Sequence, residues 1–308
     1  MTLPQARERW TALPANIQGA LWMMLSCLGF SIMASFVKLA AREIGTFEIT
    51  FFRCFFGLLV LTPVILWRGP GVLVTRHLGM HAWRGLLGSF SMMCAYFGIS
   101  RLELASYTAL SFTKPLFAIV LAVIVLRETV RWRRWGATAI GFIGVLIMMR
   151  PGTNAFDPNA FFALADALSI AILITVLKRL PAYEKPFAML FYFGVIASPL
   201  ALIPAVIVGW QWPSLQVWLL LIAIGATGAL SQYWWILAFR TGEASAVAPF
   251  DYSRLIFTGF VGLIFFSEFP DAWTLAGAGL IVASTVYIAR REARIAPTPA
   301  KPETVIDT

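Results

Sequence analysis

Three cations lie inside long apolar stretches of the sequence: Arg53, Lys114 and Arg254. A charged side chain in hydrocarbon costs about 2.5–3.5 kcal/mol on insertion scales, so each of them needs a partner or a function. Two of them end polar runs of the same form, Ser111-Phe112-Thr113-Lys114 and Asp251-Tyr252-Ser253-Arg254. Cations next to hydroxyl groups suit an anionic ligand such as a carboxylate or a phosphate, which Arg grips bidentately and Lys attracts as a point charge.

Carboxylates in the same apolar stretches offer an alternative, in which these cations are neutralised within the protein. Asp251 and Arg254 are three residues apart and share a helical face, and Asp166 could serve Lys114. Ligand binding and internal pairing stay open together, because a binding site can exchange an internal partner for its ligand. Asp166, Asp251 and Glu48 are also the candidates for gating or proton coupling, since burial raises the pKa of a carboxyl group.

Aromatic and amide groups complete the candidate site. A buried amide needs hydrogen-bond partners, which singles out Gln232 and its neighbour Tyr233. We therefore predict a substrate site formed by Lys114, Arg254, Asp251, Tyr252, Ser111, Tyr107, Gln232, Tyr233 and Arg53, with Asp166 and Glu48 for coupling or gating.

The composition places these residues in a membrane protein. Of the 308 residues, 59% are hydrophobic and only 13% are charged, whereas soluble domains carry about 25% charged residues. This excludes a soluble enzyme, a disordered chain and a disulfide scaffold, and the three cysteines read as apolar packing residues. The basic residues that give the net charge of +9 lie mostly in short spacers, which indicates contact with the membrane surface rather than with nucleic acid. No phosphate loop or hydrolase triad is present, so we expect no enzymatic activity, cofactor or metal.

The predicted fold class is all-α and integral to the membrane, with ten transmembrane helices. A span needs about 20 apolar residues. The segments that satisfy this requirement are 17–38, 46–67, 82–100, 105–126, 132–149, 158–177, 186–208, 215–239, 244–266 and 272–289.

The spacers predict the orientation. Of the 24 Lys and Arg residues, 17 fall on the side that holds both termini and four on the other side, while three lie inside spans. Basic residues favour the cytoplasmic side of a membrane. We therefore expect both termini in the cytosol of a cell that holds this chain in its inner (cytoplasmic) membrane.

The chain resembles itself at one constant offset. A shift of 140 residues places Lys114 on Arg254, Gly85 on Gly225 and Gly88 on Gly228. It also matches Ile32, Lys38, Phe47, Phe51, Ser91, Glu103 and Glu128 with Ile172, Lys178, Phe187, Phe191, Ser231, Glu243 and Glu268. A duplicated unit of five helices enters the membrane in opposite directions, because five is odd. The sequence thus predicts inverted repeats with a substrate site between them near the membrane midplane.

This duplication sets the predicted domain boundaries. They are a cytosolic N-terminal segment at 1–16, a first five-helix repeat at 17–150, a second at 151–290, and a disordered cytosolic tail at 291–308.

The stretch from Pro115 to Val145 resembles the EamA repeat of the drug/metabolite transporter superfamily. Arg127-Glu128 closes one helix of this stretch, and glycines at 136, 141 and 144 space the next. A second copy runs from Pro249 through Ser267-Glu268 to Gly279, and the run Ala248–Leu255 is similar to permeases described as S-adenosylmethionine-like or riboflavin-like. The resemblance implies two inverted repeats, alternating access and ATP-independent movement of small metabolites. The copies differ where Lys114-Pro115 becomes Arg254-Leu255.

The prediction is therefore a secondary transporter for a small carboxylate-bearing metabolite, such as an amino acid derivative or an organic acid. The alternatives are a transporter of a flavin or another aromatic or nucleoside-like compound, and a non-transporting membrane scaffold. The expected partners are the solute, the lipid bilayer, and a proton or counter-substrate. The sequence leaves open monomer or homodimer, import or export, and the coupling ion.

Overall fold

The computed structural model describes residues 13–75, 77–126, 132–153, 155–177, 186–242 and 247–295. These residues are mostly helical, in ten consecutive helical segments. They are α2 (Ala15–Ala40), α3 (Thr46–Arg68), α4 (Leu78–Arg101), α5 (Leu104–Ser111) continued by α6 (Lys114–Leu126), α7 (Trp132–Met149), α8 (Ala160–Leu177), α9 (Pro186–Val208), α10 (Leu215–Thr241), the 3₁₀ turn η2 (Ala248–Tyr252) continued by α12 (Ser253–Phe266), and α13 (Ala272–Ile295). A short 3₁₀ turn, η1 (Pro70–Leu73), follows α3.

Among the described residues, length and apolar composition suffice for a membrane crossing in five segments: α2, α3, the Leu104–Leu121 part of α5 and α6, α9 and α10. Shorter apolar helices lie within α7, α8 and α13. The helices agree with the ten predicted spans, and α13 continues beyond the predicted span to Ile295. Its extension, Arg-Arg-Glu-Ala-Arg, consists of good helix formers, and a proline follows only at 297. The rest of the predicted tail lies outside the described residues.

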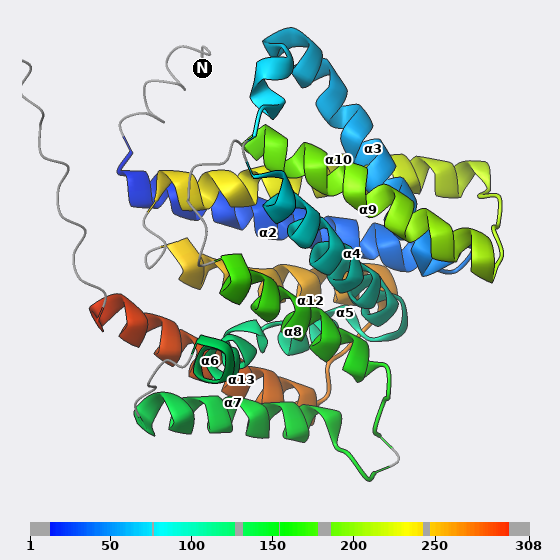
Figure 1. The fold of residues 1–308 in the computed structure, drawn as a ribbon. Helices are drawn as coiled ribbons and strands as arrows, with labels where there is room; N and C mark the ends of the chain where they lie inside the picture. Colours follow the sequence, from blue (N-terminus) through cyan, green and yellow to red (C-terminus); the bar gives the residue numbers. More distant parts are fainter. Residues whose placement is uncertain are drawn as a thin grey trace, which may run out of the picture.

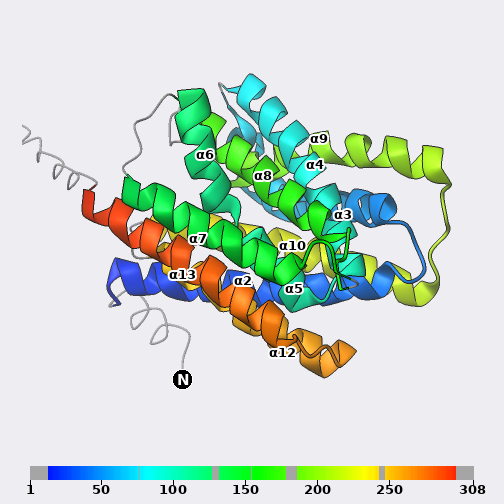
Figure 2. The same ribbon diagram turned by 90° about the horizontal axis from the view of Figure 1, so that it is seen from below.

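The helices pack in pairs that repeat from one half of the chain to the other. α2 packs against α10 as α8 packs against α4, and α3 packs against α10 as α9 packs against α4. α12 contacts α2 as α6 contacts α8. Three further contacts join equivalent helices of the two halves: α3 with α9, α7 with α13, and α5 with α12 (Figures 1 and 2). This is the contact pattern of two five-helix units related by a pseudo-two-fold axis.

Individual glycines show the same symmetry at the level of atoms. A Cβ atom on Gly85 would lie 2.4 Å from Ile196, and one on Gly225 would lie 2.3 Å from Phe56. A Cβ atom on Gly88 would meet Phe193 at 2.7 Å, and one on Gly228 would meet Arg53 at 3.0 Å. Both glycines and both partners are related by the offset of 140, so the sequence repeat is a repeat of helix contacts. Small residues permit such close approach of helices in a membrane protein.

The same offset relates two interruptions of helical structure. α5 ends at Ser111 and α6 begins at Lys114, while η2 ends at Tyr252 and α12 begins at Ser253. Between α5 and α6 the backbone bonds tighten, with Phe112 N donating to Ala109 O and Thr113 N to Leu110 O. Pro115 has no N–H to offer the carbonyl four residues earlier, which explains why the helix breaks there. Broken helices place polar backbone inside the bundle.

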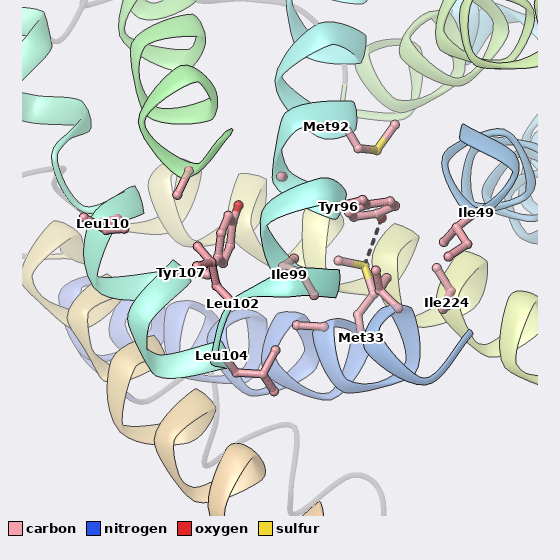
Figure 3. Close-up of a cluster of buried hydrophobic side chains, with 14 of the residues drawn as sticks. Met33, Ile49, Met92, Tyr96, Ile99, Leu102, Leu104, Tyr107, Leu110 and Ile224 are labelled. Carbon is pink, nitrogen blue, oxygen red and sulfur yellow. Dashed lines mark hydrogen bonds between the residues drawn. The ribbon is translucent and has the colours of Figure 1, made fainter. Parts of the chain in front are cut away.

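The core between these elements is apolar. Its buried members include Ile49, Leu104, Leu110, Leu221 and Ile224. Figure 3 shows how side chains from α2, α4, α5 and α10 converge there, and the hydroxyl of Tyr96 points to the sulfur of Met33 at 3.8 Å.

The glycine contacts make a prediction about stability. Gly225→Ala forces the new methyl group against Phe56, including its backbone carbon at 3.0 Å, and overpacking of this kind costs about 1–3 kcal/mol. We expect a lower melting temperature in detergent. Gly259→Ala is the matched control, because a Cβ atom at Gly259 of α12 meets nothing within 4 Å. A melting temperature for Gly225→Ala equal to that of the control would contradict the close approach of α10 and α3.

Candidate functional site

The carboxylate of Asp166 on α8 stands at the centre of a polar cluster. It accepts hydrogen bonds from Ser91 Oγ on α4 at 2.5 Å and from Tyr107 Oη on α5 at 2.9 Å. Lys114 Nζ, at the start of α6, lies 3.8 Å from the same carboxylate. Asp166 is 3% exposed. Two hydroxyl donors and one cation, from three helices, therefore surround this buried carboxylate.

The second cation of the cluster is Arg254, in the first turn of α12. Its guanidinium stands 5.5 Å above the ring of Phe30 on α2, a cation–π distance. It interacts electrostatically with Asp251 and also with Tyr107 and Asp166. Asp251 is anchored by Cys27 of α2, whose thiol lies 3.5 Å from Oδ1. The two polar runs of the sequence thus converge on one region.

A pair of aromatic rings lies where the two repeats meet. Phe112 and Tyr252 are equivalent under the offset of 140, and their ring centroids are 5.0 Å apart. Each ring belongs to the interrupted part of its repeat, next to Lys114 and Arg254 respectively. Two equivalent side chains can touch only near the symmetry axis, so the cations flank that axis from opposite repeats.

The acids break this symmetry. Asp166 is equivalent to Ser26, and Asp251 is equivalent to Ser111. At the symmetry-related contact of α2 with α10, the corresponding bond is made without a charge, with Ser26 Oγ donating to the carbonyl of Ser231 at 2.8 Å. The cluster therefore contains two cations and two anions, each acid supplied by a different helix. Its formal charge is balanced, which suits a solute carrying both signs.

Other predicted site residues lie elsewhere. Tyr233 on α10 packs against Phe187 in a separate apolar cluster, with the ring centroids 5.4 Å apart and the rings tilted, and its neighbour Gln232 is half-buried on the same helix. Arg53 on α3 lies 5.7 Å from the ring of Phe193, its symmetry equivalent, and its Nε is buried without a hydrogen-bond partner among the described residues. The structure thus brings Arg53 to the axis, but in contact with α9 rather than with Asp166.

Two further predicted residues have local hydrogen-bond roles in this conformation. Glu48 is buried near the start of α3, where it accepts from the backbone N–H groups of Gly45 and Gln211 at 2.8 and 2.5 Å. Ser111 is buried and donates to the carbonyl of Thr108 at the end of α5. Their functions in coupling and in substrate binding stay predictions.

Several residues of the cluster did not stand out in the sequence. The sequence indicated Ser91 only as a match between the two repeats. Phe30 and Phe112 have the character of ordinary apolar residues there, and Cys27 that of a packing residue. The spacing of small polar residues along α2 and α4 was the one available signal, since a serine inside a span needs a partner.

A second charged contact joins the two repeats at one end of the bundle. Lys38, at the end of α2, forms an ion pair with Glu268, which follows α12, and also donates to the carbonyl of Leu102 at 2.6 Å. Glu268 accepts from the backbone N–H of Leu104 at 2.8 Å. We name this arrangement the Lys38–Glu268 junction. The offset partners of its two charges, Lys178 and Glu128, lie outside the described residues.

Comparison with known proteins agrees with this architecture. The EamA-like transporter family matches the chain twice, at residues 17–150 and 158–290. This chain belongs to the EamA-like transporter family. It is therefore a multi-pass membrane transporter rather than an enzyme, and its described residues form ten helical segments in two inverted repeats.

Relatives of the chain move different solutes. An S-adenosylmethionine uptake transporter of Rickettsia prowazekii is 33% identical over 90% of this chain and 94% of its own length. A riboflavin transporter of Vibrio cholerae is 30% identical over 90% of this chain and 95% of its own, and a pseudopaline exporter of Pseudomonas aeruginosa is 30% identical over 88% and 96%. A solved structure that is 18% identical shares the fold, with a TM-score of 0.59 over 89% of this chain and 98% of that one.

The Lys38–Glu268 junction yields a stability prediction. Replacing Glu268 by Gln removes the ion pair and leaves a mostly buried Lys38 facing a neutral group, which costs about 1–3 kcal/mol. We expect a lower melting temperature for Glu268→Gln. Glu43→Gln is the matched control, since the bonds of Glu43 to Ser214 are exposed. Equal melting temperatures for the two variants would mean that the junction contributes nothing to closure of this end.

Proposed function

We propose that this transporter moves a small metabolite that carries an α-amino acid group, and that the cluster around Asp166 binds that group. The observation that carries the proposal is the convergence of two cations and two acids from both repeats. The carboxylate of the solute would bind Lys114 and Arg254, and its ammonium group would bind Asp166 or Asp251. Lys114 is free enough for this role, because its contact with Asp166 is long at 3.8 Å and its side chain is 24% exposed.

The aromatic residues supply the second part of the proposed site. Phe112 and Tyr252 meet at the repeat boundary, and Phe30 lies under Arg254. Rings in this position can stack on a planar group of the solute. S-adenosylmethionine combines an amino acid group with such a ring, and four relatives at 33–34% identity are named as its uptake transporters. It is therefore the first solute to test.

The pseudo-two-fold axis suggests how access would alternate. At the junction end, α12 packs against α5, and Lys38 and Glu268 join the repeats. The excess of basic residues in the spacers of one side favours an orientation in a bacterial inner membrane with this end outside the cell and both termini in the cytosol. Closure outside with the site open inward would then be one of two states that the symmetric repeats exchange. Asp166 is the candidate for a coupling group, because its buried carboxylate lies next to the exchangeable cation Lys114.

A second candidate solute is a flavin or a similar ring compound. Relatives from Vibrio cholerae and Brucella anthropi carry the name riboflavin transporter, at 30% and 27% identity. The aromatic pair favours it, whereas the balanced charges favour the amino acid group. Competition between the two solutes for uptake decides between the candidates.

The cations of the cluster give the central test. We expect Lys114→Met and Arg254→Met each to reduce uptake of radiolabelled S-adenosylmethionine into proteoliposomes by about tenfold or more, since a hydrogen bond to a charged group contributes about 1.5–3 kcal/mol. Arg68→Met is the matched control, because Arg68 is exposed at the end of α3 and stands over Trp67 and Phe187. Uptake by both variants at the rate of the wild type would refute the proposed site.

The hydroxyl of Tyr107 provides a finer test of the same site. Tyr107→Phe removes one of the two hydroxyl donors to Asp166 while keeping the ring, so the carboxylate should depend more on Lys114. We expect weaker uptake with a larger change in KM than in maximal rate, because Lys114 becomes less available to the solute. Tyr287→Phe, at a half-exposed position on α13, is the control. An unchanged KM for Tyr107→Phe would exclude this coupling.

A further inference from the structure

A charged pocket opens at the junction end of the bundle, apart from the Asp166 cluster. Its volume is about 310 Å³, and it lies among the ends of α4 and α7, the start of α5, the segment before α8 and the start of α13. Its charged lining residues are Arg101, Glu103, Arg150, Asp157 and Asp271. Leu110, Met148 and Met149 form buried apolar parts of the lining.

Arg150 is held toward this pocket by an uncommon backbone conformation. It follows α7 with φ of +47°, and such a left-handed conformation costs a residue with a side chain about 1–2 kcal/mol. Its guanidinium binds Asp271 at 2.6 Å, while its Nε is buried without a hydrogen-bond partner among the described residues. A buried donor without a partner costs free energy, and a ligand oxygen would recover it.

The acids of the pocket are held in place by hydrogen bonds. Hydrogen bonds from Thr274, together with Arg150, lower the pKa of Asp271 below its ordinary value. Asp157 binds the backbone and side-chain nitrogens of Asn159 at 2.8 Å each, and Glu103 accepts from Ser106 at 3.2 Å. Asp271 is already paired with the cation Arg150. Glu103 and Asp157 accept these bonds from uncharged donors, so their charge is available to a positive group.

The pocket lies on the same helices as the central cluster, nearer to the junction end. Ala160 lines the pocket and precedes Asp166 by six residues on α8, which is about 9 Å along a helix axis. Ser106 and Leu110 line it on either side of Tyr107 on α5, and the Tyr107 hydroxyl binds Asp166. Leu102 and Glu103 also belong to the lining, next to the carbonyl of Leu102 and the N–H of Leu104 that hold the Lys38–Glu268 junction.

We infer that this pocket is a second, outer binding site for an α-amino acid group, whose carboxylate binds Arg150 and Arg101 and whose ammonium group binds Glu103 and Asp157. Because the segment around Leu102 belongs both to the pocket and to the junction, a solute bound here lies against the contact that closes this end. The choice of solute rests on the proposed function, whereas the existence of the outer site does not depend on the central one.

Binding stoichiometry tests the outer site. The full chain is placed in lipid nanodiscs and dialysed to equilibrium against tritiated S-adenosylmethionine. We expect two molecules bound per wild-type chain and one for Arg150→Gln. Arg254→Gln, which alters only the central cluster, should also bind one. Arg68→Gln, at the opposite end of the bundle, should bind two.

A second variant distinguishes loss of the outer site from loss of folding in Arg150→Gln. Asp157→Asn keeps an acceptor for the turn at Asn159 but removes a negative charge, and we expect it to weaken the outer site about tenfold without lowering the melting temperature. One molecule per wild-type chain, lost in Arg254→Gln and retained in Arg150→Gln and Asp157→Asn, would overturn the outer site alone. Binding that Arg254→Gln leaves unchanged and Arg150→Gln reduces would overturn the central site alone. Absence of binding by the wild type would overturn both.

Discussion

The need to neutralise charge inside an apolar bundle connects the parts of this structure. Asp166 would be prohibitively costly in a membrane interior by itself, and it is tolerated because Ser91, Tyr107 and Lys114 surround it. Those three partners come from α4, α5 and α6, so one carboxylate fixes how α8 sits against the broken fourth span. The equivalent place on α2 holds Ser26, whose single bond to Ser231 makes a lighter demand.

The two-fold repeat turns this local constraint into an architecture. The contacts of Gly85 with Ile196 and of Gly225 with Phe56 are the same contact made twice, and Phe112 meets its equivalent Tyr252. The acids Asp166 and Asp251 deviate from the symmetry, whereas the glycine pairs Gly85/Gly225 and Gly88/Gly228 preserve it. Packing therefore gives the two halves the same architecture, and the acids and cations give the region between them its chemical character.

Charged residues are arranged at two levels along the bundle. The central cluster has balanced charge and lies at the interrupted helices, while the pocket at the junction end has its own arginines and acids. The Lys38–Glu268 junction binds the backbone of Leu102 and Leu104. Leu102 also lines the pocket, so the junction and the pocket adjoin each other at this segment. The pocket and the contact that closes this end of the bundle thus involve neighbouring parts of one chain segment.

The amino-acid sequence by itself determined the fold class, the ten helices and the duplication, because apolar length and a constant offset of 140 residues are properties of the linear chain. It also singled out Lys114, Arg254 and Asp166, since charges in apolar segments are conspicuous. Only the tertiary structure decided which of the candidates share a site. Tyr233 and Lys114 were equally plausible in one dimension, yet α10 turns Tyr233 toward Phe187. Which side of its helix each residue faces, and how far along the bundle it lies, depend on packing between spans that are distant in the sequence. The same holds for the contacts of Cys27 and Phe30.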